Sequence, residues 1–541
     1  MNGVDIRKRF SELETDRKAS EEVWDLLERF VYPIGGGKFF QPLSNEGELD
    51  WRRRNIYDDT AILGADTLAA SIHGSLTSPA AKWFDHEFKD ESVASNTDAI
   101  KWLSTCSKIC WETIQASNFN LEVAEGYLDL TSFGNFAMSQ EPVDDLSWDG
   151  INFDAMPLRE AYFEEDEEGQ PRCFYRLLRW TASRCISRFG RDKVPEVILK
   201  AFDSAVTNKF DIVFCVYLDE ANKDADTTKI LSKEMRPYQS KYILRENAES
   251  LGDTGGYYEM PVHFVRWRRA PGSQWGYGPG HLALSTVITL NEMIKLVLES
   301  AEKVIDPVSL VQQRGLLSDL DLQPGGKVVV KDVDKSIKAY ESSARFDVSA
   351  MQVGDLRDMI RRLFHVDQLE LKESPAMSAT EVMVRYELMN RLLGPTMGRL
   401  QTDLLNRVVD QTFMALFRAG ELPEMPDVVK QSDGIVGIQY VGPLARAQKS
   451  DEVAAMERWV MDIANFSQIY PELRHVVDPI KLALSLSEGL NVPTEILRGD
   501  AELKMRIKKD EDAQEQSMNN EMNRQALELN NLGQESGPTG V

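Results

Sequence analysis

The chain has 541 residues, of which 42% are hydrophobic and 28% charged, and its formal net charge at pH 7 is −25. This length is sufficient for three or four domains of about 150 residues each. The acidic balance argues against tight binding of nucleic acid over a large surface, because such binding is driven by basic side chains that neutralise phosphates.

Helices dominate the predicted structure of the first 134 residues. Apolar residues recur at three- and four-residue spacing between Ile6 and Phe30, and Pro33 ends this run. Three further helices are expected over about 58–76, 96–117 and 121–134. The first of these is rich in alanine and glycine, which permits close packing against a neighbouring element.

The middle of the chain is predicted to be α+β. Aromatic and β-branched runs predict strands at 173–180, 211–218 and 257–267. Between the first two strands we expect a short helix, 181–189, with Thr181 as its N-cap and Gly190 beyond its end. The acidic run 164–168, closed by Gly169, is interpreted as a solvated hairpin tip.

Two long helices that flank a small β-rich insert are predicted next. Residues 275–280 (WGYGPG) are expected to form a hinge at Gly276, Gly278 and Pro279, since glycine frees φ and proline interrupts regular pairing. A helix over 281–304 leads into the insert 308–346, where strands are expected at 309–313 and 327–331. A helix over 353–364 returns from the insert.

The longest predicted helix follows a polar loop at 366–377. It spans 378–419, begins at a capping box formed by Ser378 and Glu381, and would be on the order of 60 Å long. Gly394 and Pro395 predict a kink within it. A strand is expected at 434–441, helices after 443, and a polar tail from about 510. The fold class is therefore α+β, mainly α.

The sequence contains no recognisable catalytic, metal or cofactor site. The cysteines are scattered and odd in number, which favours buried thiols in a reducing compartment; they are Cys106, Cys110, Cys173, Cys185 and Cys215. The six histidines have neither metal-binding nor triad spacing. We expect no enzyme activity, no metal and no cofactor.

The segment Gly325-Gly326-Lys327 is the nearest approach to a phosphate-binding loop. Such a loop would need glycine at 321 and serine or threonine at 328, where this chain has Asp321 and Val328. The hydroxyl that would bind magnesium is absent, so we interpret the segment as a β-turn.

Membrane and secretion signals are also lacking in the sequence. No stretch approaches roughly 18 consecutive apolar residues, and the N-terminal MNGVDIRKRF has no apolar core of a signal peptide. We expect a cytosolic product and no membrane contact.

Several local phrases, in their order along nearly the whole chain, resemble the head-to-tail connecting (portal) proteins of short-tailed double-stranded DNA bacteriophages. These phrases are RNIYDDTA (54–61), LTSPAAKWF (76–84), PVHFVRW (261–267), SATEVMVR (378–385), LGPTMGRL (393–400), GPLARAQK (442–449) and, more weakly, NVPTEILR (491–498). Two departures are local: Tyr277 stands where these proteins often have arginine, and Arg184 where glutamine is common.

The resemblance implies a phage portal fold and a division of this chain into parts. The parts are an α/β wing (1–278 and 378–446), a first stem helix (279–304), a β-rich clip (305–346), a second stem helix (347–365), a tunnel loop (366–377), and a helical crown with the C-terminal tail (447–541). The long kinked helix would be the spine of the wing.

The resemblance also implies a ring, normally of twelve subunits, at the head-tail junction of the virion. Double-stranded DNA would pass through the ring in packaging and ejection. The terminase large subunit and later a tail adaptor would dock on it, and the major capsid and scaffolding proteins would surround it. A tail adaptor, an internal core protein or, less favoured, a packaging ATPase or nuclease remain as alternatives.

Twelve copies at −25 would carry about −300, so most of the channel wall would repel phosphates and a few charged groups would guide the duplex. The candidate channel residues are Lys295, Lys303, Arg361, Arg362, Lys372 and Glu373. The candidate docking residues of the clip are Arg314, Lys327, Lys331 and Lys335. Each cation could instead pair with an acidic residue or be an ordinary solvated side chain.

Overall fold

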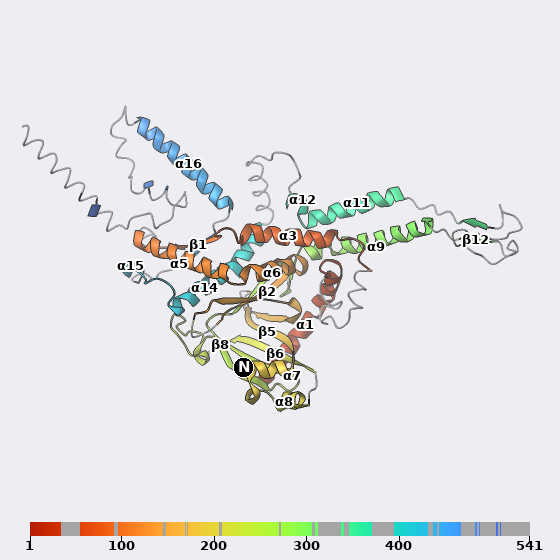
Figure 1. Cartoon of the computed structure of the whole chain (residues 1–541), viewed down its shortest axis with the longest axis horizontal. Coiled ribbons are helices and arrows are strands. Elements are labelled where there is room, and N and C mark those ends of the chain that lie inside the picture. Colours follow the sequence, from red (N-terminus) through yellow and green to blue (C-terminus); the bar gives the residue numbers. More distant parts are fainter. Residues whose placement is uncertain are drawn as a thin grey trace, which may run out of the picture. The chain divides into compact units, whose positions relative to one another are not determined.

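The computed structural model describes residues 1–33, 55–90, 96–143, 148–167, 171–204, 208–269, 272–305, 309–311, 337–339, 346–369, 394–430, 436–440, 443–466 and a few isolated positions. It is a mixed helix and strand structure (Figure 1). Two compact units are present: a larger one formed by 1–79 and 113–419, and a smaller one formed by 80–112 and 420–541.

A five-stranded antiparallel sheet packed against the first helix, α1 (Gly3–Phe30), forms one core of the larger unit. The strands lie in chain order and are β4 (Ala161–Glu165), β5 (Pro171–Thr181), β6 (Lys209–Leu218), β7 (Tyr238–Leu244) and β8 (Ser250–Tyr257). The buried residues of this core come from both elements: Ile6, Phe10, Leu13, Tyr162, Cys173, Tyr175, Val213, Cys215, Tyr217 and Ile243. The apolar spacing of α1 in the sequence therefore corresponds to its sheet-facing side.

The start of α1 is fixed by its local sequence. The Asn2 side chain accepts a hydrogen bond from the Asp5 backbone N–H at 2.8 Å, and the Asp5 carboxylate accepts one from the Asn2 backbone N–H. This reciprocal cap satisfies two of the amides that a helix start leaves without partners.

A second, three-stranded antiparallel sheet has the order β3-β2-β9 and carries two helices. Its strands are β2 (Asn135–Pro142), β3 (Ile151–Met156) and β9 (Val262–Arg266). Helix α6 (Phe119–Phe133) contacts β2 and β3, and α3 (Thr60–Leu76) packs on α6. Gly134 ends α6 in the left-handed conformation, with φ of 70°.

Replacing Gly126 by alanine is expected to destabilise the larger unit by about 1–3 kcal/mol through overpacking. A Cβ atom at Gly126 would lie 2.0 Å from Cε2 of Phe136, whose ring is fully buried and has no space to move. The matched control is Gly74→Ala in α3, where no atom lies within 4 Å of the new Cβ. Thermal unfolding should show a lower midpoint for Gly126→Ala alone; equal midpoints for the two variants would contradict this packing.

Short elements connect the strands of the larger unit. They are η1 (Leu158–Glu160), α7 (Ala182–Phe189), η2 (Arg191–Lys193), α8 (Glu196–Asp203), η3 (Lys233–Met235), β10 (Arg268–Arg269) and β11 (Gly276–Tyr277). Thr181 caps α7 by accepting from the Arg184 N–H, and Gly190 follows its end, as predicted.

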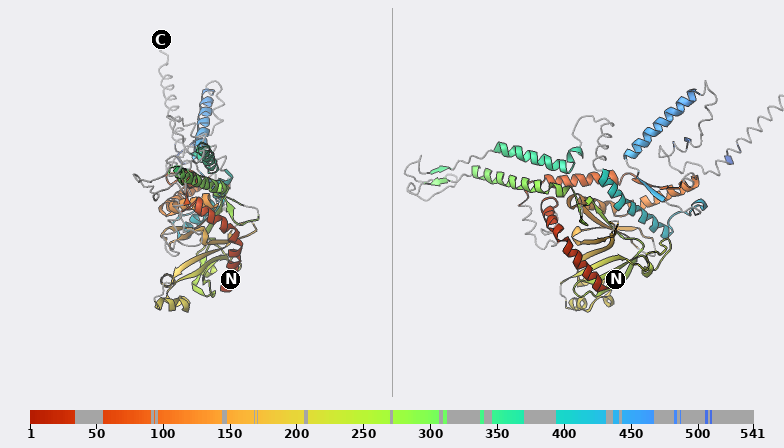
Figure 2. Two further views of the ribbon diagram at one scale, coloured as in Figure 1. Left: turned by 90° about the vertical axis from the view of Figure 1, so that its right-hand side faces the viewer. Right: turned by 180° about the vertical axis from the view of Figure 1, so that it is seen from behind.

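Two long helices lie side by side and lead to a β-hairpin, within the larger unit (Figures 1 and 2). They are α9 (Pro279–Ile305) and α11 (Phe346–Leu363), and the hairpin pairs β12 (Ser309–Val311) with β13 (Ile337–Ala339). We call α9, α11 and this hairpin the arm. The predicted helix–tip–helix order is confirmed at this level.

The segment after the arm differs in part from the prediction. Residues 366–369 form a short helix, α12 (Val366–Leu369), where a loop was expected, and 370–393 lie outside the described residues. Residues 394–400 are helical, followed by a π-helical turn, η4 (Gln401–Leu405), and by α14 (Asn406–Ala419). The predicted long helix is thus confirmed from 394 to its end.

The smaller unit holds a two-stranded antiparallel sheet of β1 (Phe84–Phe88) and β14 (Val436–Tyr440), which confirms the strand predicted near 434–441. Its helices are α5 (Thr97–Ala116, most of which lies in this unit), α15 (Asp427–Lys430) and α16 (Pro443–Phe466). On α16, Val453 is buried, whereas Trp459, Met461 and Phe466 are exposed.

Two sequence predictions are wrong in detail, and a third is tested only in part. The single strand expected at 257–267 is two elements, since β8 ends at Tyr257 and β9 begins at Val262. The strand paired with 309–311 is 337–339, whereas 327–331 lies outside the described residues. The acidic hairpin tip is not fully solvated, because Glu165 is only 14% exposed and forms an ion pair with Arg266.

Candidate functional site

The arm is anchored to the rest of the larger unit at its base. Ala283, Val287 and Leu290 of α9 are buried there, and Phe364, just after α11, is fully buried against Gly64 of α3. Asn291 extends this anchor with two hydrogen bonds: its Oδ1 accepts from the Tyr57 N–H at 2.8 Å, and its Nδ2 donates to the Asn55 carbonyl at 3.0 Å.

Both helices of the arm expose large apolar side chains, some at the base and others farther out. The most exposed are Leu282, Leu296, Leu298, Val304 and Ile305 of α9 and Met351 and Met359 of α11. Leu296 and Leu298 retain 58% and 53% of their accessible surface. An apolar surface of this kind marks an interaction site, because water opposes its exposure.

Helix α9 is also long and apolar enough to cross a membrane, by length and composition, over Pro279–Glu302. A single helix of this kind does not establish a membrane span, because apolar helices that pack on protein meet the same criterion. Only 22% of that segment is buried within the chain, which leaves most of it available for a partner.

Three of the predicted channel residues lie in the described part of the arm and its base. Each is exposed and close to an acid: Lys295 to Glu292 at 4.0 Å, Arg361 to Asp358 at 3.9 Å and Arg362 to Asp367 at 3.9 Å. Exposed pairs of this length contribute little to stability, about 0–1 kcal/mol, so these cations remain available to other anions.

The remaining candidates lie outside the described part of the chain. The side chain of Lys303 is among them, as are Lys372, Glu373 and the clip residues Arg314, Lys327, Lys331 and Lys335. Their roles stay predictions.

The predicted hinge lies where two backbones are in close contact. Asn135, fully buried, accepts from the Gly276 N–H at 2.7 Å and donates to the Gly276 carbonyl at 3.0 Å. A Cβ at Gly278 would lie 2.9 Å from Cα of Gly134, so glycine is required at this position by packing. Pro279 is the first residue of α9, where proline's missing N–H has no cost. Motion at these residues, and at Gly394 and Pro395, stays a prediction.

Arg17 and Arg266 are buried arginines that the sequence analysis did not single out. Arg17 of α1 donates to the carbonyls of Leu158, Arg159 and Ala161, and its guanidinium lies over the Tyr162 ring. One signal was present in the sequence: position 17 continues the apolar stripe of Phe10 and Leu13, where a charged residue needs internal partners.

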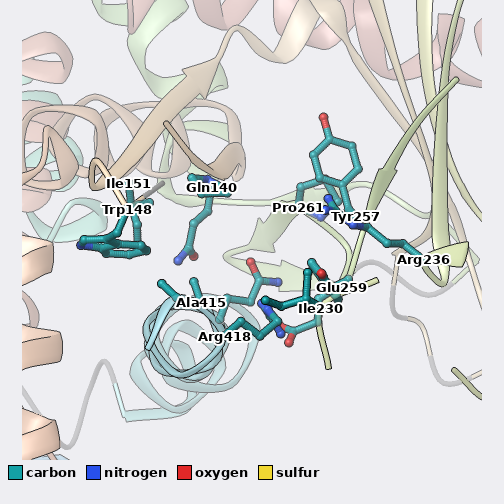
Figure 3. A pocket seen from close by; sticks show the side chains of 14 residues that line it. Gln140, Trp148, Ile151, Ile230, Arg236, Tyr257, Glu259, Pro261, Ala415 and Arg418 are labelled. Atoms are coloured by element: carbon teal, nitrogen blue, oxygen red, sulfur yellow. The ribbon is translucent and has the colours of Figure 1, made fainter. Parts of the chain in front are cut away.

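A cavity of about 210 Å³ lies between β2, β8 and the C-terminal end of α14 (Figure 3). Its chief polar feature is Tyr258, whose ring has the guanidinium of Arg418 at 4.1 Å and that of Arg236 at 4.4 Å. Arg236 also donates to the Gly256 carbonyl, and Gln140 to Thr412. The described lining contains no histidine, cysteine, serine or aspartate, and its carboxylate is that of Glu259, whose pKa is raised by burial.

No group of three or more potential metal ligands occurs among the described residues. The described cysteines are buried, and burial raises the pKa of Cys106 to about 12 and that of Cys173 to about 11. Such thiols are not reactive at neutral pH.

Acidification from pH 7 to pH 5 is expected to lower the free energy of unfolding of the larger unit by about 2 kcal/mol. Burial lowers the pKa of His263 to about 3 and that of His281 to about 4, so both stay neutral in the fold while the unfolded chain binds protons below about pH 6.5. Their stabilising effect is complete above that value and is lost as the pH falls.

Asp129 opposes this trend, because burial raises its pKa to about 7 and its contribution is lost as the pH rises. Burial also lowers the pKa of His73 and His365 and raises that of Glu259 and Asp403, so both sets gain members, and we expect the four histidines to outweigh the three acids between pH 7 and pH 5. Thermal unfolding at the two pH values checks the sign, and His263→Phe should reduce the difference. An unfolding midpoint at pH 5 that equals or exceeds the midpoint at pH 7 would contradict the expected loss of stability.

Comparison with known proteins identifies one family. A family model described as "Bacteriophage head to tail connecting protein" matches residues 4–497. The chain is 23% identical over 500 residues to a probable portal protein of Bordetella phage BPP-1, covering 91% of this chain and 88% of that protein. It is 25% identical over 519 residues to a portal protein of Salmonella phage epsilon15, covering 91% and 89%.

Among solved structures, the neck of an empty GTA particle is similar over 74% of this chain and 90% of that one. The identity is 10% and the TM-score 0.34, which is too low to establish a shared fold.

Proposed function

Because the chain belongs to the family of bacteriophage head-to-tail connecting proteins, we propose that it forms a closed ring of about twelve copies at one capsid vertex. Double-stranded DNA enters the head through this ring during packaging and leaves through it during ejection. The role is structural, without catalysis.

The family match over residues 4–497 carries this proposal, and the exposed arm supports it. In a closed ring each copy makes two different contacts, one with each neighbour. A pair of helices with large apolar side chains on its outer faces supplies such contacts, because neighbouring arms would cover one another. We therefore assign α9 and α11 to the stem, the insert around β12 and β13 to the clip, the segment 370–377 after α12 to the tunnel loop, and α16 to the crown.

The clip is proposed to dock the terminase large subunit during packaging and a tail adaptor afterwards. The wing, formed by the two sheets and their helices, would face the major capsid protein and, during assembly, the scaffolding protein. These partners follow from the proposed place of the ring at the head-tail junction.

Neutralising three arm cations is expected to weaken the salt-dependent attraction of DNA to the ring. The variant Lys295→Gln/Arg361→Gln/Arg362→Gln should reduce the slope of log affinity against log salt by about 0.9 for each phosphate that the ring no longer neutralises. Fluorescence anisotropy of a labelled duplex at several salt concentrations measures this slope. Lys200→Gln, which removes an exposed lysine of α8, is the control, and an unchanged slope in the triple variant would remove these residues from the channel.

The mass of the purified full chain in solution tests the ring. Sedimentation velocity or mass photometry should show a species near 740 kDa, as expected for about twelve copies of the 61.3 kDa chain. The same sample should show no ATP hydrolysis. A stable monomer at high concentration, or ATPase activity that copurifies with the chain, would contradict the proposal.

A further inference from the structure

A group of arginines lies at the base of the arm, where β9 packs against η4. Arg266 ends β9, Arg269 follows in β10, and Arg399 lies in the helical turn before η4. With Arg407 of α14 they surround the carboxylates of Glu165 and Asp403. We call these residues the arginine cluster.

Arg266 is the most buried member of the arginine cluster. It is 4% exposed and donates to the Gly169 carbonyl at 2.8 Å and the Gln274 carbonyl at 3.0 Å, and it forms an ion pair with Glu165. Arg269 lies on the other side of that carboxylate, with its Nη2 3.3 Å from Oε2 of Glu165. One carboxylate is therefore shared by two guanidinium groups.

The donors of the arginine cluster are not all satisfied. Nε of Arg266 and Nη1 of Arg399 are buried and have no hydrogen-bond partner in the described structure. Buried polar groups without partners are rare in folded proteins and call for an explanation, of which a missing ion or partner is one. The turn that carries Asp403 is π-helical, a feature that is frequent at functional sites.

Positive charge is concentrated in the arginine cluster. All four arginines act on the Asp403 carboxylate, two of them share Glu165, and burial, with Arg269 next, lowers the pKa of Arg266 to about 10. Like charges in a poorly solvated site repel one another strongly. A further anionic group at the open side, where Arg269 is 44% exposed, would relieve this repulsion.

We propose that the arginine cluster receives a carboxylate side chain from a second copy of this chain, and so forms part of the contact between neighbours in the ring. This inference rests on the proposed ring. The chain has 87 acidic and 62 basic residues, so two copies present acidic surfaces to each other almost everywhere. Where the arginine cluster of one copy meets acidic side chains on the facing surface of its neighbour, this repulsion is removed and the relative position of the two copies is fixed.

A carboxylate side chain fits the arginine cluster better than the sugar–phosphate backbone of a DNA duplex does. A single carboxylate at the end of a side chain can contact the exposed side of Arg269, and it would reach the buried nitrogen atoms of Arg266 and Arg399 only if neighbouring side chains moved aside. Phosphates on a DNA duplex lie on a wide cylinder, which contacts exposed cations instead. Arginine and carboxylate also match in geometry, because the planar fork donates two parallel hydrogen bonds.

The test measures ring assembly of the full chain by mass photometry over a range of protein and salt concentrations. Arg399→Gln and Arg269→Gln are expected to weaken assembly by about tenfold or more, since removing one partner of a desolvated charge pair has a large effect. Arg399→Lys, which keeps the charge, should recover part of that loss. Arg179→Gln, which removes a half-exposed arginine paired with Asp211 in the same unit, is the matched control and should assemble normally.

The outcomes separate the two proposals. If the wild-type chain forms no ring, both fall. If the wild type forms rings and the two glutamine variants assemble equally well, this inference alone is overturned. If the two glutamine variants assemble normally but bind DNA more weakly, the arginine cluster contacts nucleic acid instead, and the inference of a contact between copies is overturned.

Sulfate provides a second readout if a variant does not fold. At low millimolar concentration, where its general salting-out effect is small, it should compete for the guanidinium groups and weaken wild-type assembly more than chloride does at equal ionic strength. Equal effects of the two anions would overturn the inference without any substitution.

Discussion

Replacing Arg17 by methionine is expected to lower the free energy of unfolding of the larger unit by about 3–5 kcal/mol. The fully buried guanidinium donates from Nη1 to the Ala161 carbonyl at 2.6 Å, and from Nη2 to that of Arg159 at 2.9 Å. Its Nε lies 2.8 Å from the Glu21 carboxylate. Methionine fills a similar volume but leaves these acceptors without a donor, and each unsatisfied buried group costs about 1–3 kcal/mol.

Urea unfolding followed by circular dichroism measures this effect. Arg9→Met is the matched control on the same helix, because Arg9 is 44% exposed and its pairs with Glu12 and Glu164 are partly solvated. That change should cost less than about 1 kcal/mol. Arg17→Lys should give an intermediate value, since lysine keeps the charge but not the planar fork. Equal stability of Arg17→Met and wild type would show that α1 docks through its apolar residues alone.

The second large effect is expected on assembly. Changing Leu296 and Leu298 together to glutamate should weaken ring formation by about 100-fold or more, because burying each leucine contributes about 1.5–3 kcal/mol and about 1.4 kcal/mol corresponds to a factor of ten. Both side chains are more than half exposed in the single chain, so the monomer should fold as before.

Native mass spectrometry and circular dichroism of the same sample separate assembly from folding. Val197→Glu in α8, a partly exposed apolar residue at the far end of the larger unit from the arm, is the control (Figure 1). Rings that persist in the Leu296→Glu/Leu298→Glu variant would exclude the arm as the contact between neighbours.

The helices of this fold were largely predictable from the sequence. The boundaries of α1, α3 and α9 follow closely from apolar spacing, and those of α7 from its cap Thr181 and from Gly190, which act over a few residues. Helix α11 begins earlier than predicted, at Phe346 rather than at 353. Strands were harder to predict, and β1, β2, β3, β4, β7 and β8 were missed. Most of them pair with the next strand in the chain, but they hold few β-branched residues, as in β2 (NFAMSQEP) and β8 (SLGDTGGY). The second strand of the arm hairpin, 337–339, was also missed.

The helices that carry the candidate site residues could be predicted from the sequence, but the contacts of these residues could not. Lys295, Arg361 and Arg362 could be selected because they lie on the two predicted stem helices. Composition alone favoured mobility at Gly276, whereas the structure holds it through Asn135, 141 residues away in the chain. The acidic run places Glu165 among several solvated acids, and only the fold brings it to Arg266. Long-range pairs of this kind leave no local signal.

Negative-stain electron microscopy of the purified full chain shows directly whether it forms a ring. Closed rings with rotational symmetry and a central hole wide enough for a DNA duplex are expected. Open filaments, compact particles without a hole, or monomers that persist at high protein concentration would contradict the proposed ring.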